Sequence, residues 1–217
     1  RRAGMPVGLI SDLAVGTDPS GSHAWTRQEE VLARLSPGAP PDIFNPRGQA
    51  WGLTAFSPRA LAANGYRAFI ELLRASLAHA GGVRIDHALG LSRMWLVPEG
   101  ASPDEGAYVR YPFQDMMRLV ALESWRHRAI VIGENLGTVP EGFNEQIARA
   151  GMLGMDVLWF TREGGWPGAP FKAPGDWSRQ ALATTTTHDL PTVAGWWRGT
   201  DIRWRAGLGL LAEGRDA

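Results

Sequence analysis

Three acidic residues, Asp86, Glu134 and Asp189, each lie at or just past the end of a short apolar or β-branched run that is typical of a strand. Because the carboxyl ends of parallel strands meet at one edge of a sheet or barrel, we expect the three side chains to lie close together. Carboxylates that converge without an adjacent Lys disfavour one another's ionisation, which costs free energy and is typical of catalytic sites. A single acid after a strand is as readily explained as the cap of a following helix, but the trio favours a site.

Two carboxyl groups at neighbouring strand ends are what retaining glycoside transfer requires. One carboxylate attacks the sugar and a protonated carboxylic acid gives its proton to the leaving oxygen, with the two groups about 5–5.5 Å apart. Asp86 and Glu134 suit these roles. Arg84 precedes Asp86 by two positions, so both side chains share one face of the strand and the cation would keep Asp86 ionised. Gly133 would let the backbone beside Glu134 pack closely.

The elements expected to position these residues belong to an α/β fold. Apolar or β-branched runs alternate with stretches of helical periodicity, which predicts repeated βα units around a parallel sheet. An open doubly wound sheet and part of a (β/α)₈ barrel both fit this pattern, and a complete barrel takes about 250 residues. The predicted strands are 7–13, 83–87, 129–134, 155–160 and 181–187, and the predicted helices are 59–80, 116–128, 141–150 and one that begins near Pro191.

A long stretch, residues 16–58, separates the first predicted strand from the first predicted helix. It is rich in Gly, Pro, Ser and Asp, and it holds Trp25, Phe44 and Trp51. Because a plain connection is rarely this long, we interpret it as an inserted substrate-binding loop region. Glycines flank Trp51 closely and would let the backbone present the indole to a sugar, although an aromatic side chain can equally serve the core. A second long loop is expected from Trp95 to Pro112.

The composition sets limits on the class of protein. The 217 residues are 44% hydrophobic with a formal net charge of +0, so we expect a globular protein with no general attraction to nucleic acid or to an anionic membrane. Cysteine is absent, which excludes disulfides and a cysteine nucleophile and is compatible with the cytoplasm. We find no apolar run long enough to span a bilayer and no secretory leader.

Four segments closely resemble motifs of the amylomaltase family, glycoside hydrolase family 77, in order and in spacing. Three resemble the catalytic motifs: Arg84 to His87 (RIDH), Ile132 to Pro140 (IGENLGTVP) and Thr186 to Thr192 (TTHDLPT). The fourth, Gly38 to Phe44 (GAPPDIF) with Gly48 to Gly52 (GQAWG), resembles the substrate-binding loop. One departure is Asn135, where many members carry Asp.

The resemblance implies a 4-α-glucanotransferase that moves segments of α-1,4-glucan from a maltodextrin donor to a sugar acceptor without metal or organic cofactor. Asp86 would be the nucleophile, Glu134 the general acid/base, and Asp189 would bind hydroxyls of the distorted sugar. The residues that would contact or support the substrate are Arg84, His188, His87, Asp42, Phe44 and Trp51. For His87, a hydrogen-bonded strand-end histidine is an equally good interpretation.

The resemblance also bears on how much of a barrel is present. It begins at what corresponds to the third barrel strand and ends after the seventh, so we expect residues 1–217 to be one incomplete catalytic barrel region with long βα loops. The sequence starts at Arg1 without Met, which fits a fragment.

Other functions stay open at this point. A glycoside hydrolase of the related α-amylase superfamily would use the same three acids with water as acceptor. A truncated maltodextrin-binding piece without activity is the alternative from a different class. A nucleotide-binding α/β protein is disfavoured because no Gly-x-Gly-x-x-Gly or P-loop pattern follows a predicted strand.

Overall fold

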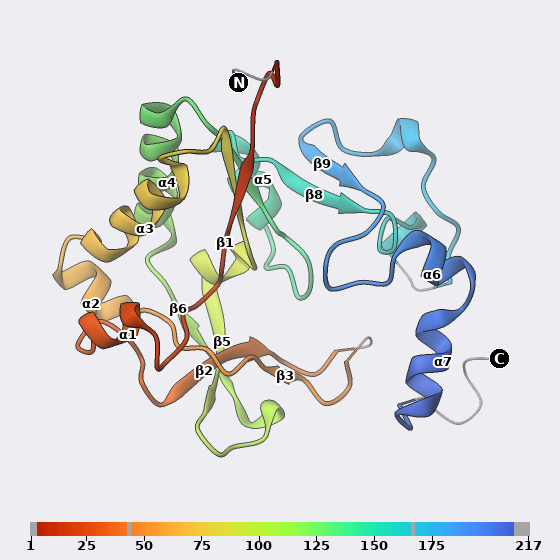
Figure 1. Cartoon of the computed structure of the whole chain (residues 1–217), viewed down its shortest axis with the longest axis horizontal. Coiled ribbons are helices and arrows are strands. Elements are labelled where there is room, and N and C mark those ends of the chain that lie inside the picture. Colours follow the sequence, from red (N-terminus) through yellow and green to blue (C-terminus); the bar gives the residue numbers. More distant parts are fainter. Residues whose placement is uncertain (1–3, 43–44, 166–167, 211–217) are drawn as a thin grey trace. The chain divides into compact units, whose positions relative to one another are not determined.

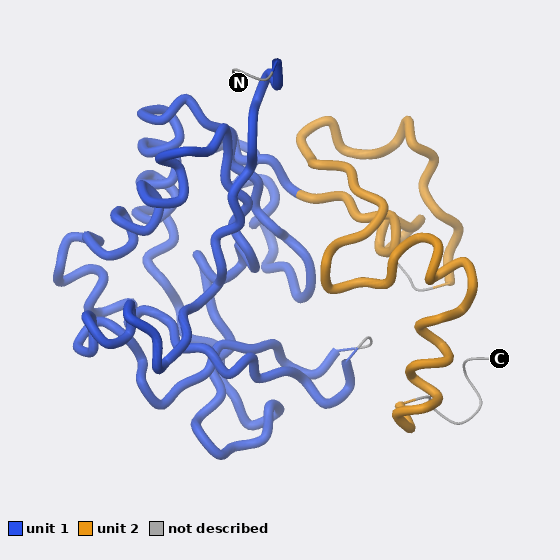
Figure 2. Tube along the Cα trace, in the orientation of Figure 1, with its two compact units in different colours: residues 1–154 blue, residues 155–217 orange. Residues whose placement is uncertain are grey.

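The computed structural model describes residues 4–42, 45–165 and 168–210 (Figure 1). The chain divides into two compact units, residues 1–154 and 155–217 (Figure 2). The predicted α/β class is confirmed, because parallel strands alternate with helices in the first unit.

A three-stranded parallel sheet forms the centre of the first unit. Its strands are β1 (Ile10–Leu13), β4 (Gly82–Ile85) and β7 (Ile130–Gly133), in the spatial order β1-β4-β7. In the register of this sheet, Arg84 lies opposite Asp12 on one side and Ile132 on the other. The three strands therefore end side by side, which brings the residues that follow them to one edge.

Helices cover the sheet and supply most of its core. α3 (Arg67–Leu77) packs against β1 and β4, and α4 (Phe113–His127) packs against α3 and β7. The apolar residues of α3 recur at helical spacing, so Phe69, Leu73 and Leu77 are buried on one face. The two helices are also joined by Arg74, which donates two hydrogen bonds of 2.9 and 3.1 Å to the buried carboxylate of Glu123.

The single helix predicted over residues 59–80 is wrong in one respect, because the structure divides it into α2 (Pro58–Ala63) and α3. Gly65 and Tyr66 between them both adopt left-handed backbone conformations, with φ of 57° and 59°. Such a conformation ends a right-handed helix. α2 begins at Ser57, whose hydroxyl accepts a hydrogen bond from the Ala60 N–H, a typical helix cap.

The first unit also contains a separate antiparallel sheet, whose strands come from segments predicted as loops. Its spatial order is β3-β2-β5-β6. Met94 and Leu96 point into the core from β5, whereas Arg93 and Trp95 lie on the other face. The strands and the short helix in these segments are α1 (Ser22–Thr26), β2 (Leu35–Ala39), β3 (Gln49–Ala50), β5 (Arg93–Pro98) and β6 (Ala107–Arg110).

The first unit closes with α5 (Phe143–Arg149), after which Leu153 pairs in parallel with Ile132 of β7. The second unit contains a two-stranded sheet and two short helices. Thr192 caps the first of these helices by accepting a hydrogen bond of 3.0 Å from the Gly195 N–H, close to the helix start predicted after Pro191. The elements are β8 (Gly154–Val157), β9 (Ala181–Thr184), α6 (Val193–Trp197) and α7 (Thr200–Gly207).

Among the described residues, no helix has both the length and the apolar character that crossing a membrane would require.

Candidate active site

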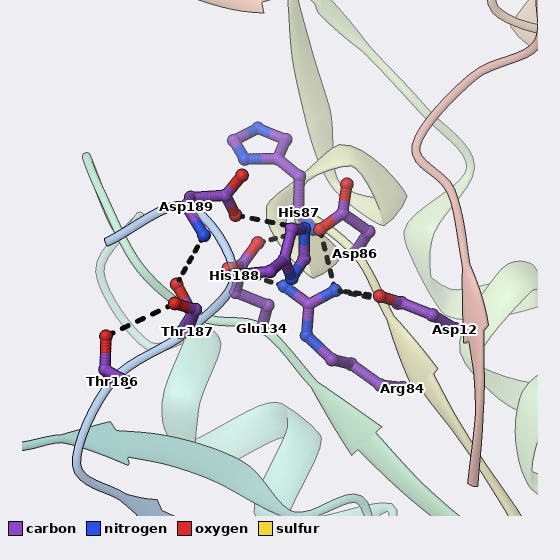
Figure 3. Close-up of polar contacts among 9 residues, drawn as sticks. All are labelled: Asp12, Arg84, Asp86, His87, Glu134, Thr186, Thr187, His188 and Asp189. Carbon is purple, nitrogen blue, oxygen red and sulfur yellow. Dashed lines mark hydrogen bonds and ion pairs between the residues drawn. The ribbon is translucent and has the colours of Figure 1, made fainter. Parts of the chain in front are cut away.

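The guanidinium of Arg84 forms the centre of the site and contacts three carboxylates (Figure 3). Nη1 lies 2.9 Å from Asp86 Oδ1, and Nη2 donates a hydrogen bond of 2.7 Å to Glu134 Oε1. Only 11% of the Arg84 side chain is exposed, against 30% for Asp86 and 14% for Glu134. The structure thus joins through one cation the two acids that the sequence assigned to nucleophile and acid/base.

The backbone around Glu134 fixes its carboxylate from a second direction. The His87 N–H donates a hydrogen bond of 2.9 Å to Glu134 Oε2, so both oxygens of this carboxylate have a partner. His87 adopts a left-handed conformation with φ of 44°, which is uncommon for a residue other than glycine and turns the chain just after β4. The ladder between β4 and β7 also continues beyond the strands, since the Glu134 N–H donates to the Ile85 carbonyl at 3.0 Å.

Burial and neighbouring charges shift the protonation equilibria of the site. Burial raises the pKa of Glu134, and the charge of Asp86 adds to the effect; the His87 N–H and the Arg84 cation oppose it without cancelling it. The pKa of Arg84 is raised, because its carboxylate partners outweigh the effect of burial. Burial lowers the pKa of the His87 imidazole, and the charge of Asp86 opposes this only in part. The site therefore combines a carboxylic acid that retains its proton to higher pH, a permanent cation and an imidazole that favours its neutral form.

The long segment predicted to bind substrate reaches this cluster through Trp51. Its indole meets the His87 ring edge to face, with 5.1 Å between ring centroids, and its Nε1 donates a hydrogen bond of 2.9 Å to Gln49 Oε1. Asp42 is half-buried and accepts a hydrogen bond of 2.6 Å from the Asn45 N–H. This contact shapes the turn between β2 and β3, and Phe44 lies outside the described residues.

Asp12 is a member of the cluster that reasoning from the sequence missed. Its two carboxylate oxygens accept hydrogen bonds of 2.7 and 2.9 Å from Arg84 Nη1. Asp12 is the third residue of β1, and it faces Arg84 directly in the parallel ladder. The same reasoning that selected Asp86, an acid at the end of an apolar strand, would have found Asp12 as well.

A cavity of about 320 Å³ adjoins the cluster within the first unit. Asp12, Asp86 and His87 line it together with apolar side chains such as Phe69 and Met94. Asp12 and Asp86 therefore lie where this largely apolar cavity meets the edge of the sheet.

Asp189 and His188 belong to the second unit. There the His188 Nε2 lies 3.3 Å from Asp189 Oδ2, and both side chains are 66% exposed. The Thr187 hydroxyl accepts a hydrogen bond of 3.3 Å from the Asp189 N–H (Figure 3). Thr186 donates one of 2.8 Å to the Pro191 carbonyl, so the turn after β9 is held by its own side chains. The meeting of Asp189 with Asp86 and Glu134 stays a prediction.

The described residues contain no group of three or more His, Cys, Asp or Glu side chains that could hold a metal ion. Asp12, Asp86 and Glu134 share the single positive charge of Arg84.

Comparisons with known proteins bear on what this site belongs to. The chain is 45% identical over 218 aligned residues to a 4-alpha-glucanotransferase of Mycobacterium tuberculosis, and 36% identical over 211 to one of Haemophilus influenzae. The two alignments include 100% and 97% of this chain but only 30% of each relative. The chain therefore spans about a third of the relatives' length.

Solved structures give the same result for the fold. A crystal structure of amylomaltase from Corynebacterium glutamicum matches with a TM-score of 0.89 and 39% identity, over 99% of this chain and 30% of that one. An amylomaltase from Streptococcus agalactiae in complex with acarbose matches with a TM-score of 0.75 over 96% of this chain and 43% of that one; its 19% identity supports the fold alone. The family model described as 4-alpha-glucanotransferase matches residues 1–213. The chain therefore belongs to the 4-alpha-glucanotransferase family, glycoside hydrolase family 77.

Proposed function

We propose that this chain carries the catalytic acids of a retaining 4-α-glucanotransferase that moves α-1,4-glucan segments between maltodextrins. The observation that supports this most directly is the bridge of Arg84 between Asp86 and Glu134. The bridge pairs a carboxylate beside a cation with a buried carboxylic acid whose pKa is raised. Retaining transfer requires two such groups, a carboxylate that attacks the sugar and an acid that can give up a proton.

In the first half of the reaction, a carboxylate oxygen of Asp86 attacks the anomeric carbon of the donor. The glycosidic C–O bond breaks, and Glu134 gives its proton to the departing 4-oxygen. This leaves a glycosyl ester on Asp86 and an ionised Glu134. In the second half, Glu134 takes the proton of an acceptor 4-hydroxyl, whose oxygen attacks the same carbon and releases Asp86. Protons and bonds balance over the cycle, so the chemistry needs no cofactor.

Further residues bind the two sugars between which the glucan segment moves. Asp189 and His188 bind hydroxyls of the distorted donor sugar, while Asp42, Phe44 and Trp51 contact the acceptor. The contact between Trp51 and the His87 ring supports the acceptor role of Trp51, because it places an indole next to the residue that follows the nucleophile. Aromatic rings of this kind stack on the apolar face of a sugar.

We also propose that the chain forms part of a (β/α)₈ barrel in a cytoplasmic protein. β1, β4, β7, β8 and β9 would be strands 3 to 7 of a (β/α)₈ barrel, in which all three acids follow strand ends. The loops between them would be the long βα loops of the active face. We place the protein in the cytoplasm, with which a sequence free of cysteine is compatible.

Incubation with maltotriose tests the function, with the protein expressed from its complete gene. A transferase produces glucose together with oligomers longer than maltotriose, whereas a hydrolase produces only shorter sugars. Asp86→Asn, which keeps the shape of the side chain, is the matched inactive control. Shorter sugars alone would refute transfer. Binding of acarbose, measured by calorimetry, together with no turnover of maltotriose would instead indicate a binding protein.

A further inference from the structure

Asp12 holds the most exposed position among the three carboxylates around Arg84, with 51% of its side chain accessible. Both of its oxygens nevertheless accept hydrogen bonds from Arg84 Nη1, at 2.7 and 2.9 Å. The pairing of β1 with β4 sets Asp12 directly opposite Arg84. The contact is thus built into the register of the sheet and does not depend on a loop.

The Nη1 atom of Arg84 serves two carboxylates at once, Asp12 and Asp86, while Nη2 serves Glu134. One positive charge is therefore divided among three acids. Without the carboxylate of Asp12, the guanidinium would lose the contact that restrains it from the β1 side, and its charge would act on Asp86 and Glu134 alone.

We propose that Asp12 is a positioning residue of this site, which orients the Arg84 guanidinium between nucleophile and acid/base and takes up part of its positive charge. The inference rests on the proposed transferase function, because it assigns Asp12 a role in the protonation of Glu134. Asp12 itself acts through Arg84.

The sign of the effect follows from the groups that face Glu134. In the first unit these are the Arg84 cation and the Asp86 carboxylate from the β4 side, the backbone N–H of His87, and Asp12 through Arg84. Arg84 lowers the pKa of Glu134, and burial and Asp86 raise it. Removing the negative charge of Asp12 strengthens the influence of Arg84, so the pKa of Glu134 falls and less of the acid stays protonated near neutrality.

The test measures the protonation of Glu134 directly as well as through catalysis. Glutamate carboxyl carbons are labelled with ¹³C, and the Glu134 resonance is identified by its loss in Glu134→Gln. Its titration is compared in the wild type, Asp12→Asn, Asp12→Ser and Asp12→Glu. The control is Glu99→Gln, which breaks an exposed ion pair between Arg34 and Glu99 that shares no residue with the cluster. Transfer from maltotriose is measured across pH on the same proteins.

We expect Asp12→Asn and Asp12→Ser to lower the titration midpoint of Glu134 by about 0.5–1 pH unit, a small value for a charge partner because Asp12 is half-exposed. The alkaline limb of the rate profile should move by the same amount. Asp12→Glu should restore most of the shift, and Glu99→Gln should cause none. A Glu134 midpoint that stays in place or rises in both neutral variants would overturn the role of Asp12, even if the rate falls. If the Glu134 midpoint falls in the Asp12 variants but the wild type transfers no glucan, the positioning role of Asp12 is supported and the proposed transferase function is refuted.

Discussion

Gly133, the last residue of β7, leads directly into Glu134 and is packed so closely that a side chain has no room. A methyl group placed on its Cα would lie 2.6 Å from Met152 Sδ and 3.0 Å from Ala88 Cβ. Carbon and sulfur atoms in van der Waals contact are separated by about 3.5–4 Å, so both contacts are overlaps. Met152 and Ala88 are themselves buried, which leaves them little room to move away.

Gly133→Ala is therefore expected to destabilise the protein through overpacking. Inserting one methyl group into a well-packed interior costs about 1–3 kcal/mol. For a chain of this size each kcal/mol lowers the melting temperature by about 2–4 °C, so a fall of about 2–12 °C follows. The flexible end of Met152 can absorb part of the overlap, whereas the Cβ of Ala88 is fixed to the backbone.

Thermal unfolding of Gly133→Ala beside Gly175→Ala measures this effect. Gly175 is the matched control because a methyl group there would meet no atom within 4 Å, so its replacement should change the free energy of unfolding by no more than about 0.5 kcal/mol. Combining Gly133→Ala with Met152→Ala should show a favourable coupling of about 1 kcal/mol, because the smaller side chain makes space for the methyl group. Equal melting temperatures for the two glycine variants would refute the packing described around Glu134.

Three further results are expected. Asp86→Asn should abolish transfer while maltodextrin still binds, because it removes covalent capacity with little change of shape; turnover above about a thousandth of wild type would exclude Asp86 as nucleophile. Glu134→Gln should keep activity on a glycosyl fluoride, whose leaving group needs no proton, and lose it on maltotriose; equal losses on both substrates would speak against an acid role. Trp51→Ala should cost much less than the roughly 3–5 kcal/mol of a fully buried Trp, because the indole is only half-buried, and should raise the share of hydrolysis over transfer. A large loss of stability with an unchanged product ratio would contradict the acceptor role of Trp51.

The parallel strands could be predicted from the sequence, and the antiparallel sheet could not. β7 is a continuous apolar run and β4 is apolar apart from Arg84, and each is followed by an acid, a pattern with few other interpretations. β2 contains Pro37 and Gly38, which usually argue against a strand, and its pairing with β5 bridges residues far apart in the sequence. Burial in β5 alternates only from Arg93 to Leu96, and Met94 to Val97 are all apolar, so its sequence shows no apolar and polar alternation that would identify a strand.

The arrangement of the site was predictable wherever it depends on the sheet alone. Arg84 and Asp86 share a face of β4, and Glu134 ends the adjacent strand, so their meeting follows from parallel register. The contact of Trp51 with His87 depends on the path of a long segment and on a left-handed residue, neither of which leaves a pattern in the sequence. The expectation that Asp189 joins these acids rests on its motif alone and stays a prediction.

The charge cluster also has a consequence for how the protein acquires its structure. Asp12 and Arg84 are 72 residues apart in the chain, and Arg84 and Glu134 are 50 apart. Parallel pairing over such separations is slow, because the entropy of closing long loops is lost before any contact compensates for it. A chain in which β1 has not yet joined β4 has no Asp12 beside Arg84, and one without β7 has no Glu134. The electrostatic arrangement at the acids therefore forms only once these strands have paired, so a partly folded chain lacks the burial that raises the pKa of Glu134.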